Sequence, residues 1–492
     1  MLQKRKIIGV MLVLLTAADL GGCSVNPATG NQNFTGFMSL EDERRIGAKE
    51  HPKILKSFGG AYKDQAVTAY VNNIGNQLAA RSELPNIKWT FTVLNSPQIN
   101  AFALPGGYIY VTRGLMALAG SEAELAGVIA HEIGHVTGRH TAQRYSKATG
   151  ASIMGAILGI AVGSRAVSEL FNVGADLYLQ SFSREQEFEA DSLGVRYLSR
   201  TNYDTKSMVS FLSKLRSHSQ LEAKRHEKDP SSVDQGDMFA THPRTIDRVE
   251  RAIKNVKGTK SGVRLGTVDY MELLHNMLYG DDPKEGFIKG HTFIHPELRF
   301  RFDVPESFRL FNSPRAVVAK GPGGSIIQFD MAGKPYSGAM TSYIPNVWAR
   351  RSSFKRVERI TVNGLQGATA TARVRQRSGT FDLRFVAIRQ RMNRSDDRIY
   401  RFMFLTPVNF TDRLSLGLRK TTFSLRSISF TEAQQSKPTR ILVKPVRAGD
   451  GIQTFIRQMN IDDFKEETFR VINGLAANDN LRRGKLVKII SE

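Results

Sequence analysis

The stretch that most constrains this chain is a run near residue 130, where two histidines and a glutamate form the pattern His-Glu-Xaa-Xaa-His. Ser121 followed by Glu124 forms a capping box, which predicts that a helix begins there. On that helix His131 and His135 lie one turn apart on the same face, so that both imidazoles can bind one ion. Glu132 lies beside them and can take a proton from a zinc-bound water. The pattern predicts a catalytic site with one zinc ion per chain.

A site with two histidines needs a third ligand, which for this motif is usually a carboxylate from another helix. The segment 181–198 reads SFSREQEFEADSLGVRYL and supplies four acidic candidates. Glu187 and Asp191 are four residues apart and share a helix face, whereas Glu189 points nearly opposite. We therefore predict Glu187 as the third zinc ligand and Asp191 as the acceptor that fixes a ligand histidine. Without a metal, a solvated acidic helix face would explain the segment as well.

The first 22 residues read as a signal peptide rather than as part of a domain. A basic stretch at 4–6 precedes an apolar stretch at 7–15 that is too short to span a bilayer comfortably. Leu-Gly-Gly-Cys at 20–23 resembles the lipobox of bacterial lipoproteins, which implies cleavage before Cys23 and lipidation of that residue. Cys23 is the single cysteine, so no intramolecular disulfide can form. Ser24 would favour the outer membrane in a Gram-negative cell; the alternative is an ordinary secretory signal with an incidental cysteine.

Residues 39–112 read as helices followed by strands. Helices are expected from Ser39 and over 64–80, and strands over 88–94 and 108–112. A proline in a strand run argues for a sheet edge, and an open edge can pair with an extended peptide. A plain structural hairpin is the alternative. The residues expected to bind substrate are Asn100, Ala103, Leu104, Pro105, Gly106 and Gly107.

The uncharged segment 148–164 contains three glycines at four-residue spacing. It is at the lower limit of length for a membrane span. We therefore expect a hydrophobic hairpin that packs on the catalytic domain or dips into a lipid surface.

Three motifs together resemble the gluzincin metallopeptidases: HEIGH at 131–135, EFEAD at 187–191, and Thr-His-Pro at 241–243 with an arginine shortly after. The most similar group holds the HtpX heat-shock protease, the periplasmic protease-chaperone BepA and the type-I CAAX prenyl proteases. NAFALPGGYIYVTRGLM at 100–116 looks like that group's substrate-side strand, and CSVNPATGNQNF resembles the mature start of its lipoprotein members. The resemblance spans about residues 23–255 and implies a mainly helical zincin-type domain with a small edge sheet. It also implies His131, His135 and Glu187 as zinc ligands and Glu132 as the catalytic base.

Roles for His242 and Arg248 are also implied by the resemblance. His242 would either approach the zinc as an extra ligand that holds the site closed, or polarise the scissile carbonyl. Arg248 would stabilise the oxyanion, because a fixed cation acts where charge develops. The alternative is that Thr241 caps a helix and Arg248 is only surface-paired. His140, placed on the same helix nine residues after His131, fits neither ligand spacing and is expected to have no special role.

The remaining chain divides into two parts. Residues 285–432 alternate like strands and resemble faintly a PsbP-type domain; within 291–430 there are 24 Lys and Arg against 9 Asp and Glu, a net charge of +15. Such a charge suits anionic lipid, lipopolysaccharide or peptidoglycan, and nucleic acid is not expected because no nucleic-acid-binding motif occurs; a solvated basic face is the alternative. Residues 441–492 resemble a divergent LysM module, which implies binding to peptidoglycan.

These observations predict an α+β multidomain protein with a signal peptide at 1–22, a peptidase domain at 23–265, a basic domain at 285–432 and a LysM-like module at 441–492. The expected function is that of a lipid-anchored, periplasm-facing zinc endopeptidase that acts on misfolded or misassembled envelope proteins. A BepA-like assembly chaperone with occasional proteolysis and a peptidoglycan-binding scaffold are the alternatives.

Overall fold

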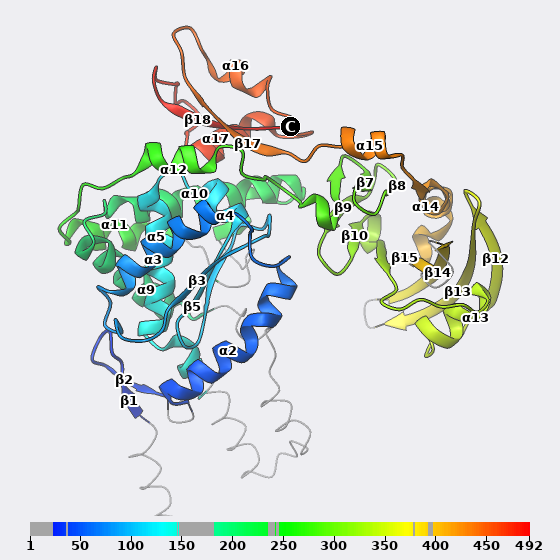
Figure 1. The fold of residues 1–492 in the computed structure, drawn as a ribbon, viewed down its shortest axis with the longest axis horizontal. Helices are drawn as coiled ribbons and strands as arrows, with labels where there is room; N and C mark the ends of the chain where they lie inside the picture. Colours follow the sequence, from blue (N-terminus) through cyan, green and yellow to red (C-terminus); the bar gives the residue numbers. More distant parts are fainter. Residues whose placement is uncertain are drawn as a thin grey trace, which may run out of the picture. The chain divides into compact units, whose positions relative to one another are not determined.

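The protein is described here from a computed structural model, which mixes helices with several sheets (Figure 1). The expected α+β multidomain class is confirmed. One compact unit contains Met1–Tyr279 together with Arg440–Ser491, and the other contains Gly280–Thr439 with Glu492. The residues that the structure describes are 23–35, 38–144, 146, 182–234, 242, 246–376, 379–391 and 397–492. The expectations for the signal peptide at 1–22, for the apolar segment 148–164 and for Thr241 lie outside these residues.

The first unit is built around helix α5, Glu122–Thr137, in which every residue is buried. Its position follows from its sequence, because apolar or small residues fill all sides of the helix apart from the histidines and acids. Among the described residues before Tyr279, the other α-helices with given bounds are α2 (Leu40–Ser57), α3 (Gln65–Ala79), α4 (Arg113–Leu118), α9 (Arg184–Arg200), α10 (Lys206–Arg225), α11 (Ile246–Lys257) and α12 (Thr267–Leu274). Among the described residues, no helix is long and apolar enough to cross a membrane.

The expected helices begin at side-chain caps. Ser39 accepts from the backbone of Asp42 in a capping box at the start of α2, and Asp64 accepts from Val67 at the start of α3. The start predicted at Ser121 is also present, with Ser121 accepting from the backbone of Glu124.

A three-stranded sheet lies beside these helices, in the order β3 (Thr90–Leu94), β5 (Tyr108–Thr112), β4 (Ala101–Leu104). β3 pairs parallel to β5, and β4 pairs antiparallel to it. β4 is therefore an edge strand, while β5 lies in the middle. A short hairpin of β1 (Cys23–Val25) and β2 (Gln32–Phe34) precedes the helices.

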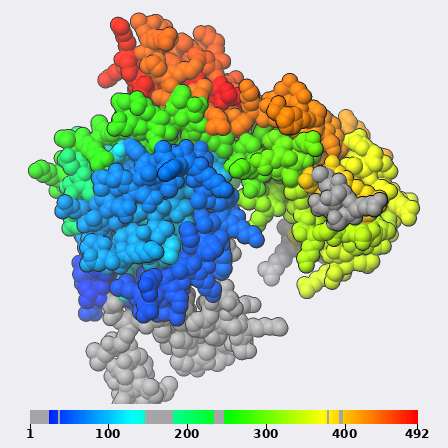
Figure 2. Space-filling view, in the orientation of Figure 1, coloured from blue at the N-terminus to red at the C-terminus, as the bar shows by residue number. Residues whose placement is uncertain are grey.

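The C-terminal segment belongs to the first unit rather than standing apart from it. It consists of β17 (Arg440–Pro445), α16 (Ile452–Ile456), α17 (Lys465–Asn473) and β18 (Leu486–Ser491), with β17 antiparallel to β18. Lys488 is completely buried, and its ammonium donates to Ala117 O at 2.6 Å and to Ala119 O at 2.7 Å at the end of α4. Figure 2 shows this segment, in orange and red, against the green residues before Tyr279.

The second unit contains a seven-stranded and a four-stranded antiparallel sheet. Its core is rich in phenylalanine, including Phe293, Phe302, Phe329 and Phe402. The large sheet has the order β12 (Arg356–Val362), β13 (Leu365–Gln376), β14 (Gly379–Arg391), β15 (Asp397–Pro407), β11 (Ile326–Met331), β10 (Val317–Lys320), β9 (Arg309–Asn312). The small one has the order β16 (Arg426–Ser427), β8 (Phe300–Asp303), β7 (Thr292–His295), β6 (Phe287–Lys289). Its helices are α13 (Met340–Tyr343), α14 (Thr411–Ser424) and α15 (Phe430–Gln435).

Candidate metal centre

Two glycines let α9 and its neighbours approach α5 closely enough to form a site. A Cβ added at Gly134 of α5 would lie 3.1 Å from the carbonyl oxygen of Ala190 on α9. A Cβ added at Gly194 of α9 would lie 3.3 Å from the backbone nitrogen of His131. Both contacts are tight for a side chain, so glycine sets the spacing between the helices that carry the histidines and the acids.

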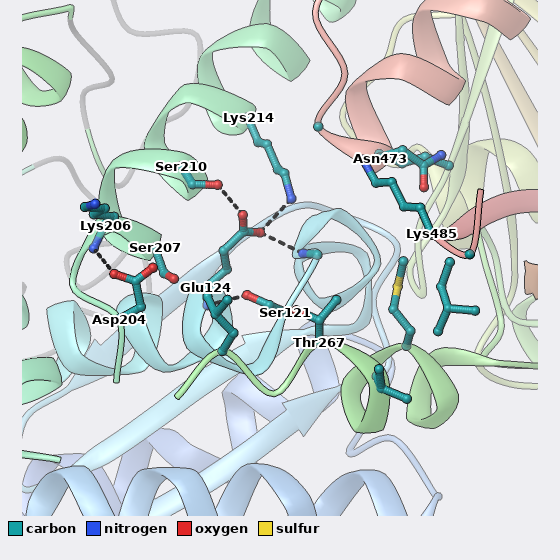
Figure 3. A pocket seen from close by; sticks show the side chains of 18 residues that line it. Ser121, Glu124, Asp204, Lys206, Ser207, Ser210, Lys214, Thr267, Asn473 and Lys485 are labelled. Atoms are coloured by element: carbon teal, nitrogen blue, oxygen red, sulfur yellow. Dashed lines mark hydrogen bonds and ion pairs between the residues drawn. The ribbon is translucent and has the colours of Figure 1, made fainter. Parts of the chain in front are cut away.

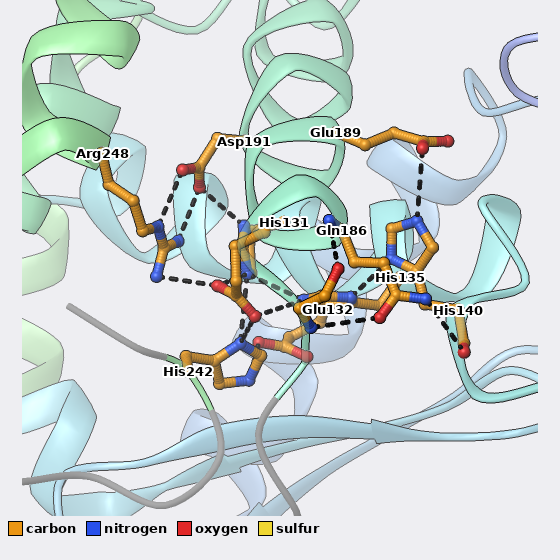
Figure 4. Close-up of polar contacts among 11 residues, drawn as sticks. His131, Glu132, His135, His140, Gln186, Glu189, Asp191, His242 and Arg248 are labelled. Carbon is orange, nitrogen blue, oxygen red and sulfur yellow. Dashed lines mark hydrogen bonds and ion pairs between the residues drawn. The ribbon is translucent and has the colours of Figure 1, made fainter. Parts of the chain in front are cut away.

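Four buried side chains from three segments converge at one point (Figure 4). His131 and His135 come from α5, Glu187 from α9, and His242 from the residues before α11. One potential ligand atom from each of them lies within 4.8 Å of the corresponding atom of every other. The structure thus brings together the three predicted ligands and the residue for which a gating role was considered.

The distances between the ligand atoms of this cluster suit an ion with tetrahedral coordination. His131 Nε2 lies 3.0 Å from His135 Nε2 and 3.4 Å from His242 Nδ1. The Glu187 carboxylate lies 3.4 Å from His135 Nε2, 3.6 Å from His131 Nε2 and 2.8 Å from His242 Nδ1. Four ligand atoms at zinc bond lengths of about 2.0–2.1 Å are about 3.3 Å apart. Three imidazoles and a carboxylate are also the donor types that zinc accepts, so these residues fit the metal.

The charge states fit as well. Burial lowers the pKa of His135 well below its usual value, which keeps the ring neutral as a ligand requires. Burial alone would raise the pKa of Glu187, but His242 and Arg248 outweigh burial and lower it well below its usual range. Glu187 is therefore an anion inside the protein.

Asp191 and Arg248 contact two of the predicted ligands, His131 and Glu187. Asp191 Oδ1 lies 2.8 Å from His131 Nδ1, so the other ring nitrogen of His131 faces the cluster. Arg248 donates from Nε and Nη2 to the two Asp191 oxygens at 2.9 and 2.7 Å. Its Nη1 lies 2.8 Å from Glu187 Oε2. This is the arrangement expected of residues that orient metal ligands.

The position of Arg248 differs from both expectations, the oxyanion-stabilising cation and the surface-paired residue. Its side chain is buried, so it is not the surface-paired residue of the capping alternative. Its three guanidinium nitrogens already contact the two carboxylates, which makes it a positioning residue for Glu187 and Asp191 rather than a free cation for an oxyanion. The reason is that α11 places Arg248 behind α9, where the two acids are the nearest counter-charges.

Glu132 lies on α5 beside the cluster and faces a small pocket. Its Oε1 is 3.4 Å from His242 Nε2, and among the described residues its buried Oε2 has no hydrogen-bond partner. Burial raises the pKa of Glu132. The pocket is lined by Asn100, Ala101, Leu115, Val128, His131, Glu132, Met208, Phe211, Leu212, Leu215, His242 and Arg248.

The residues expected to bind substrate separate into two places. Asn100 lines the pocket next to Glu132, at the start of the edge strand β4, and Ala103 lies within that strand. Leu104 packs in a cluster with residues of α2. The turn of Pro105, Gly106 and Gly107 also meets α2, because a Cβ on Gly106 would lie 2.6 Å from Arg44 Cα. The structure does not bring Leu104 or the turn to the pocket.

His140 is a residue that the sequence reasoning set aside. Helix α5 ends at Thr137, because Gly138 caps it and Arg139 takes a left-handed φ of 52°. His140 is therefore not on the α5 face, and the prediction that placed it there was wrong. The turn brings its Nδ1 to 2.8 Å from His135 Nδ1. The glycine after the helix was a possible signal, since glycine often ends helices.

Residues 65–256 match the family model described as Peptidase family M48. This segment is similar to peptidase family M48. The resemblance to gluzincin peptidases drawn from the motifs is thus confirmed at the level of the family. The M48 segment contains the whole residue cluster described above.

Several curated relatives match part of this chain. The Beta-barrel assembly-enhancing protease of Yersinia pestis is 32% identical over 256 residues, which cover 50% of this chain and 50% of that protein. Its namesake in Escherichia coli K12 is 30% identical over 262 residues, with coverage of 51% and 52%. The Mitochondrial metalloendopeptidase OMA1 of Schizosaccharomyces pombe is 29% identical over 182 residues, with coverage of 36% and 53%. The chain spans about half the length of these relatives.

A solved structure of cyanobacterial PsbP from Synechocystis sp. PCC 6803 is also similar, at 13% identity over 28% of this chain and 91% of that one. Its TM-score is 0.22, which is too low to support a shared fold. The PsbP-type assignment of the basic domain stays a prediction.

Proposed function

We propose that the chain is a zinc-dependent endopeptidase of the bacterial cell envelope that hydrolyses misfolded or misassembled proteins. One observation carries this proposal: two imidazoles and a carboxylate meet at tetrahedral spacing with Glu132 beside them at a pocket. The family of the M48 segment and the names of its relatives support a peptidase that serves protein quality control.

Zinc would be held by His131, His135 and Glu187, where it would supply Lewis-acid chemistry by polarising a peptide carbonyl and making water more acidic. Glu132 would accept the proton of the attacking water and deliver it to the leaving amine. Burial raises the pKa of Glu132, which favours holding that proton between the two transfers. Asp191 and Arg248 keep the ligands oriented. Asn100 lines the pocket just before the edge strand β4 and would guide an extended peptide.

The proposed location rests on the lipobox-like motif at residues 20–23. A lipid on Cys23 would tether the body to a membrane, with the outer membrane favoured by Ser24. The two bacterial relatives named for enhancing β-barrel assembly support an envelope substrate. Labelled palmitate should enter the wild-type chain and should not enter Cys23→Ser.

The C-terminal segment supports a further partner, an anionic envelope polymer such as peptidoglycan. Its β-α-α-β order is that of the LysM-like module predicted from sequence. A cavity of about 480 Å³ lies between this segment and the starts of α5 and α10 (Figure 3). Lys206, Lys214 and Lys485 line it, and Lys214 is paired with Glu124 at 2.7 Å. Co-sedimentation with purified peptidoglycan should be lost in Lys206→Glu/Lys485→Glu.

The test of the peptidase proposal is Glu132→Gln in the purified chain. The variant should bind zinc as the wild type does, because Glu132 is not a ligand, and its cleavage of unfolded casein should fall at least about a hundredfold. Metal content and casein cleavage with and without a chelator measure the two properties. Full activity in the zinc-loaded variant would contradict the role of Glu132, and wild-type cleavage that resists the chelator would contradict the metal centre.

An assembly chaperone with occasional proteolysis is the second candidate. The observation that favours it is His242, whose Nδ1 lies within the ligand cluster, 2.8 Å from Glu187 Oε1, where it would hold the site closed. Complementation of a deletion strain separates the two. Rescue by Glu132→Gln would indicate that holding clients suffices, whereas rescue by wild type alone would indicate that cleavage is required.

A further inference from the structure

The ligand His135 contacts a second histidine, and a series of further contacts leads from that histidine away from the metal centre. His135 Nε2 faces the other ligands, so its Nδ1 is left to find a partner inside the protein. That partner is His140 Nδ1 at 2.8 Å, and both rings are buried. On its other side His140 Nε2 lies 3.7 Å from Glu189 Oε2, as Figure 4 shows.

The chain of contacts ends in the N-terminal hairpin. Asn26 lies in the turn between β1 and β2, where its Oδ1 accepts from the backbone of Ala28 at 2.9 Å and of Thr29 at 3.3 Å. These two bonds fix which end of the amide is oxygen. The Nδ2 group therefore points outward from the turn, and it donates to Glu189 Oε1 at 2.7 Å.

The proton positions in this chain follow from the metal ligand. When Nε2 of His135 binds an ion, its Nδ1 carries a hydrogen and must donate. His140 Nδ1 must then accept, so the His140 ring carries its hydrogen on Nε2, the nitrogen that faces Glu189 Oε2 at 3.7 Å. His135 thus donates to His140, Asn26 donates to Glu189 at 2.7 Å, and the contact between His140 Nε2 and Glu189 Oε2, at 3.7 Å, is electrostatic rather than a hydrogen bond.

We propose that His140, Glu189 and Asn26 form a relay that positions the ligand His135 and couples the N-terminal hairpin to the metal centre. The relay would do for His135 what Asp191 does for His131, with a histidine inserted between ligand and carboxylate. It rests on the proposed metal centre. Because β1 begins at Cys23, the residue proposed to carry the lipid, the relay leads from the anchored end of the chain to the metal.

The relay explains why Glu189 is on α9 although it points away from Glu187. Its half-buried carboxylate lies 3.7 Å from His140 Nε2 and accepts from Asn26 Nδ2 at 2.7 Å. The turn at Gly138 and Arg139 serves the same arrangement. Arg139 donates to Glu43 Oε1 at 2.8 Å and to Met38 O at 2.6 Å, which fixes the turn that presents His140.

The experiment measures zinc affinity of the purified full-length chain by competition with a chromophoric chelator, together with the visible spectrum of the cobalt-substituted protein. His140→Leu should lower zinc affinity about 10- to 100-fold, the range seen when a partner of a ligand histidine is lost. Glu189→Gln should lower it by a smaller factor, and Asn26→Ala should weaken it in the same direction. His140→Leu should also shift the cobalt bands, which report ligand geometry.

Two variants distinguish positioning from packing. His140→Asn keeps an acceptor near the position of Nδ1 and should recover part of the affinity lost in His140→Leu. Glu185→Gln makes the same chemical change as Glu189→Gln on an exposed residue of the same helix, and should bind zinc as wild type does. Equal losses in His140→Asn and His140→Leu, or wild-type affinity and cobalt bands in His140→Leu and Glu189→Gln, would overturn the relay.

The metal centre is tested apart from the relay by His131→Ala and His135→Ala. Loss of zinc binding in both, with no effect of His140→Leu, would leave the proposed function standing and remove the relay. Zinc binding that survives both ligand substitutions would remove the metal centre itself.

Discussion

Arg248 contacts both carboxylates on which the metal centre depends, Glu187 and Asp191, and all three side chains are buried. Buried charges are costly without a partner, so each of these acids needs the guanidinium in the metal-free chain. A zinc ion would supply part of the same compensation to Glu187. Arg248 therefore matters most for stability when the metal is absent.

We expect Arg248→Met to lower the free energy of unfolding of the metal-free chain by about 3–5 kcal/mol, because it leaves two buried carboxylates uncompensated. The loss should be smaller with zinc bound. Urea unfolding with zinc and with chelator measures both values. Arg45→Met, which breaks an exposed pair with Asp42, is the control and should cost at most about 1 kcal/mol. An equal loss with and without zinc would contradict the account.

His295 makes the stability of the second unit depend on pH. The ring is buried among Phe293 and Phe300, and burial, followed by the nearby Arg398, lowers the pKa of His295 to about 4. In the unfolded chain the same ring titrates near 6.5. Between these values the unfolded state binds more protons, so the second unit loses stability as the pH falls from about 6.5 to 4.

Between pH 7 and pH 5 this single group should cost the second unit on the order of 2 kcal/mol. Urea unfolding followed by the fluorescence of Trp348, in a Trp89→Phe background, reports this unit. His295→Leu should flatten the dependence by that amount over the same interval. An unchanged slope in the variant would mean that other groups account for the titration.

At the scale of elements, helix α5 contains two glycines, Gly127 and Gly134, whose surroundings differ. A Cβ on Gly127 would meet Leu198 Cδ1 at 3.7 Å, an ordinary contact, whereas a Cβ on Gly134 would meet the Ala190 backbone at 3.1 Å. Ala190 sits between the two acids of α9 that serve the site. A shift of α9 at this point therefore moves Glu187 and Asp191 with it.

Gly127→Ala should stabilise the chain by about 0.5–1 kcal/mol through helix propensity and leave zinc affinity unchanged. Gly134→Ala should gain little or no stability, because the helix gain is offset by the displaced backbone, and should bind zinc about tenfold more weakly. Thermal unfolding and chelator competition measure the pair. Equal zinc affinity in the two variants would show that the spacing of α5 and α9 does not set the site.

How far sequence reasoning reached can be seen in the same elements. The start of α5 was predictable because Ser121 and Glu124 act locally. Its end was not, because the left-handed turn at Arg139 is held by contacts to Glu43 and Met38, about a hundred residues away in sequence. The placement of His140 failed for that reason. Its contact with Glu189 depends on the same turn and carries no periodic signal.

At the scale of the molecule, the second unit is an insertion within the first. The chain leaves the first unit near Tyr279 and returns to it at Arg440. The two points are adjacent, because an isolated β-bridge joins Leu278 to Arg440 and Asn276 N donates to Ile441 O at 2.8 Å. The sequence suggested three successive parts, because residues 441–492 resemble a module of their own. The fold instead buries the ammonium of Lys488 of this segment against the end of α4. A contact between residues so distant in the chain has no local pattern.

This arrangement predicts opposite outcomes for two deletions. Replacing 281–438 with a short Gly-Ser linker should preserve casein cleavage, because both crossing points are adjacent and the core of the first unit is untouched. Ending the chain at Thr439 should abolish it, because that exposes the core around Ile441 and leaves the carbonyls of α4 without Lys488. Zinc affinity and cleavage of both variants, compared at equal soluble concentration, decide the matter. A chain ending at Thr439 that retains both would show that the C-terminal segment is an independent module after all.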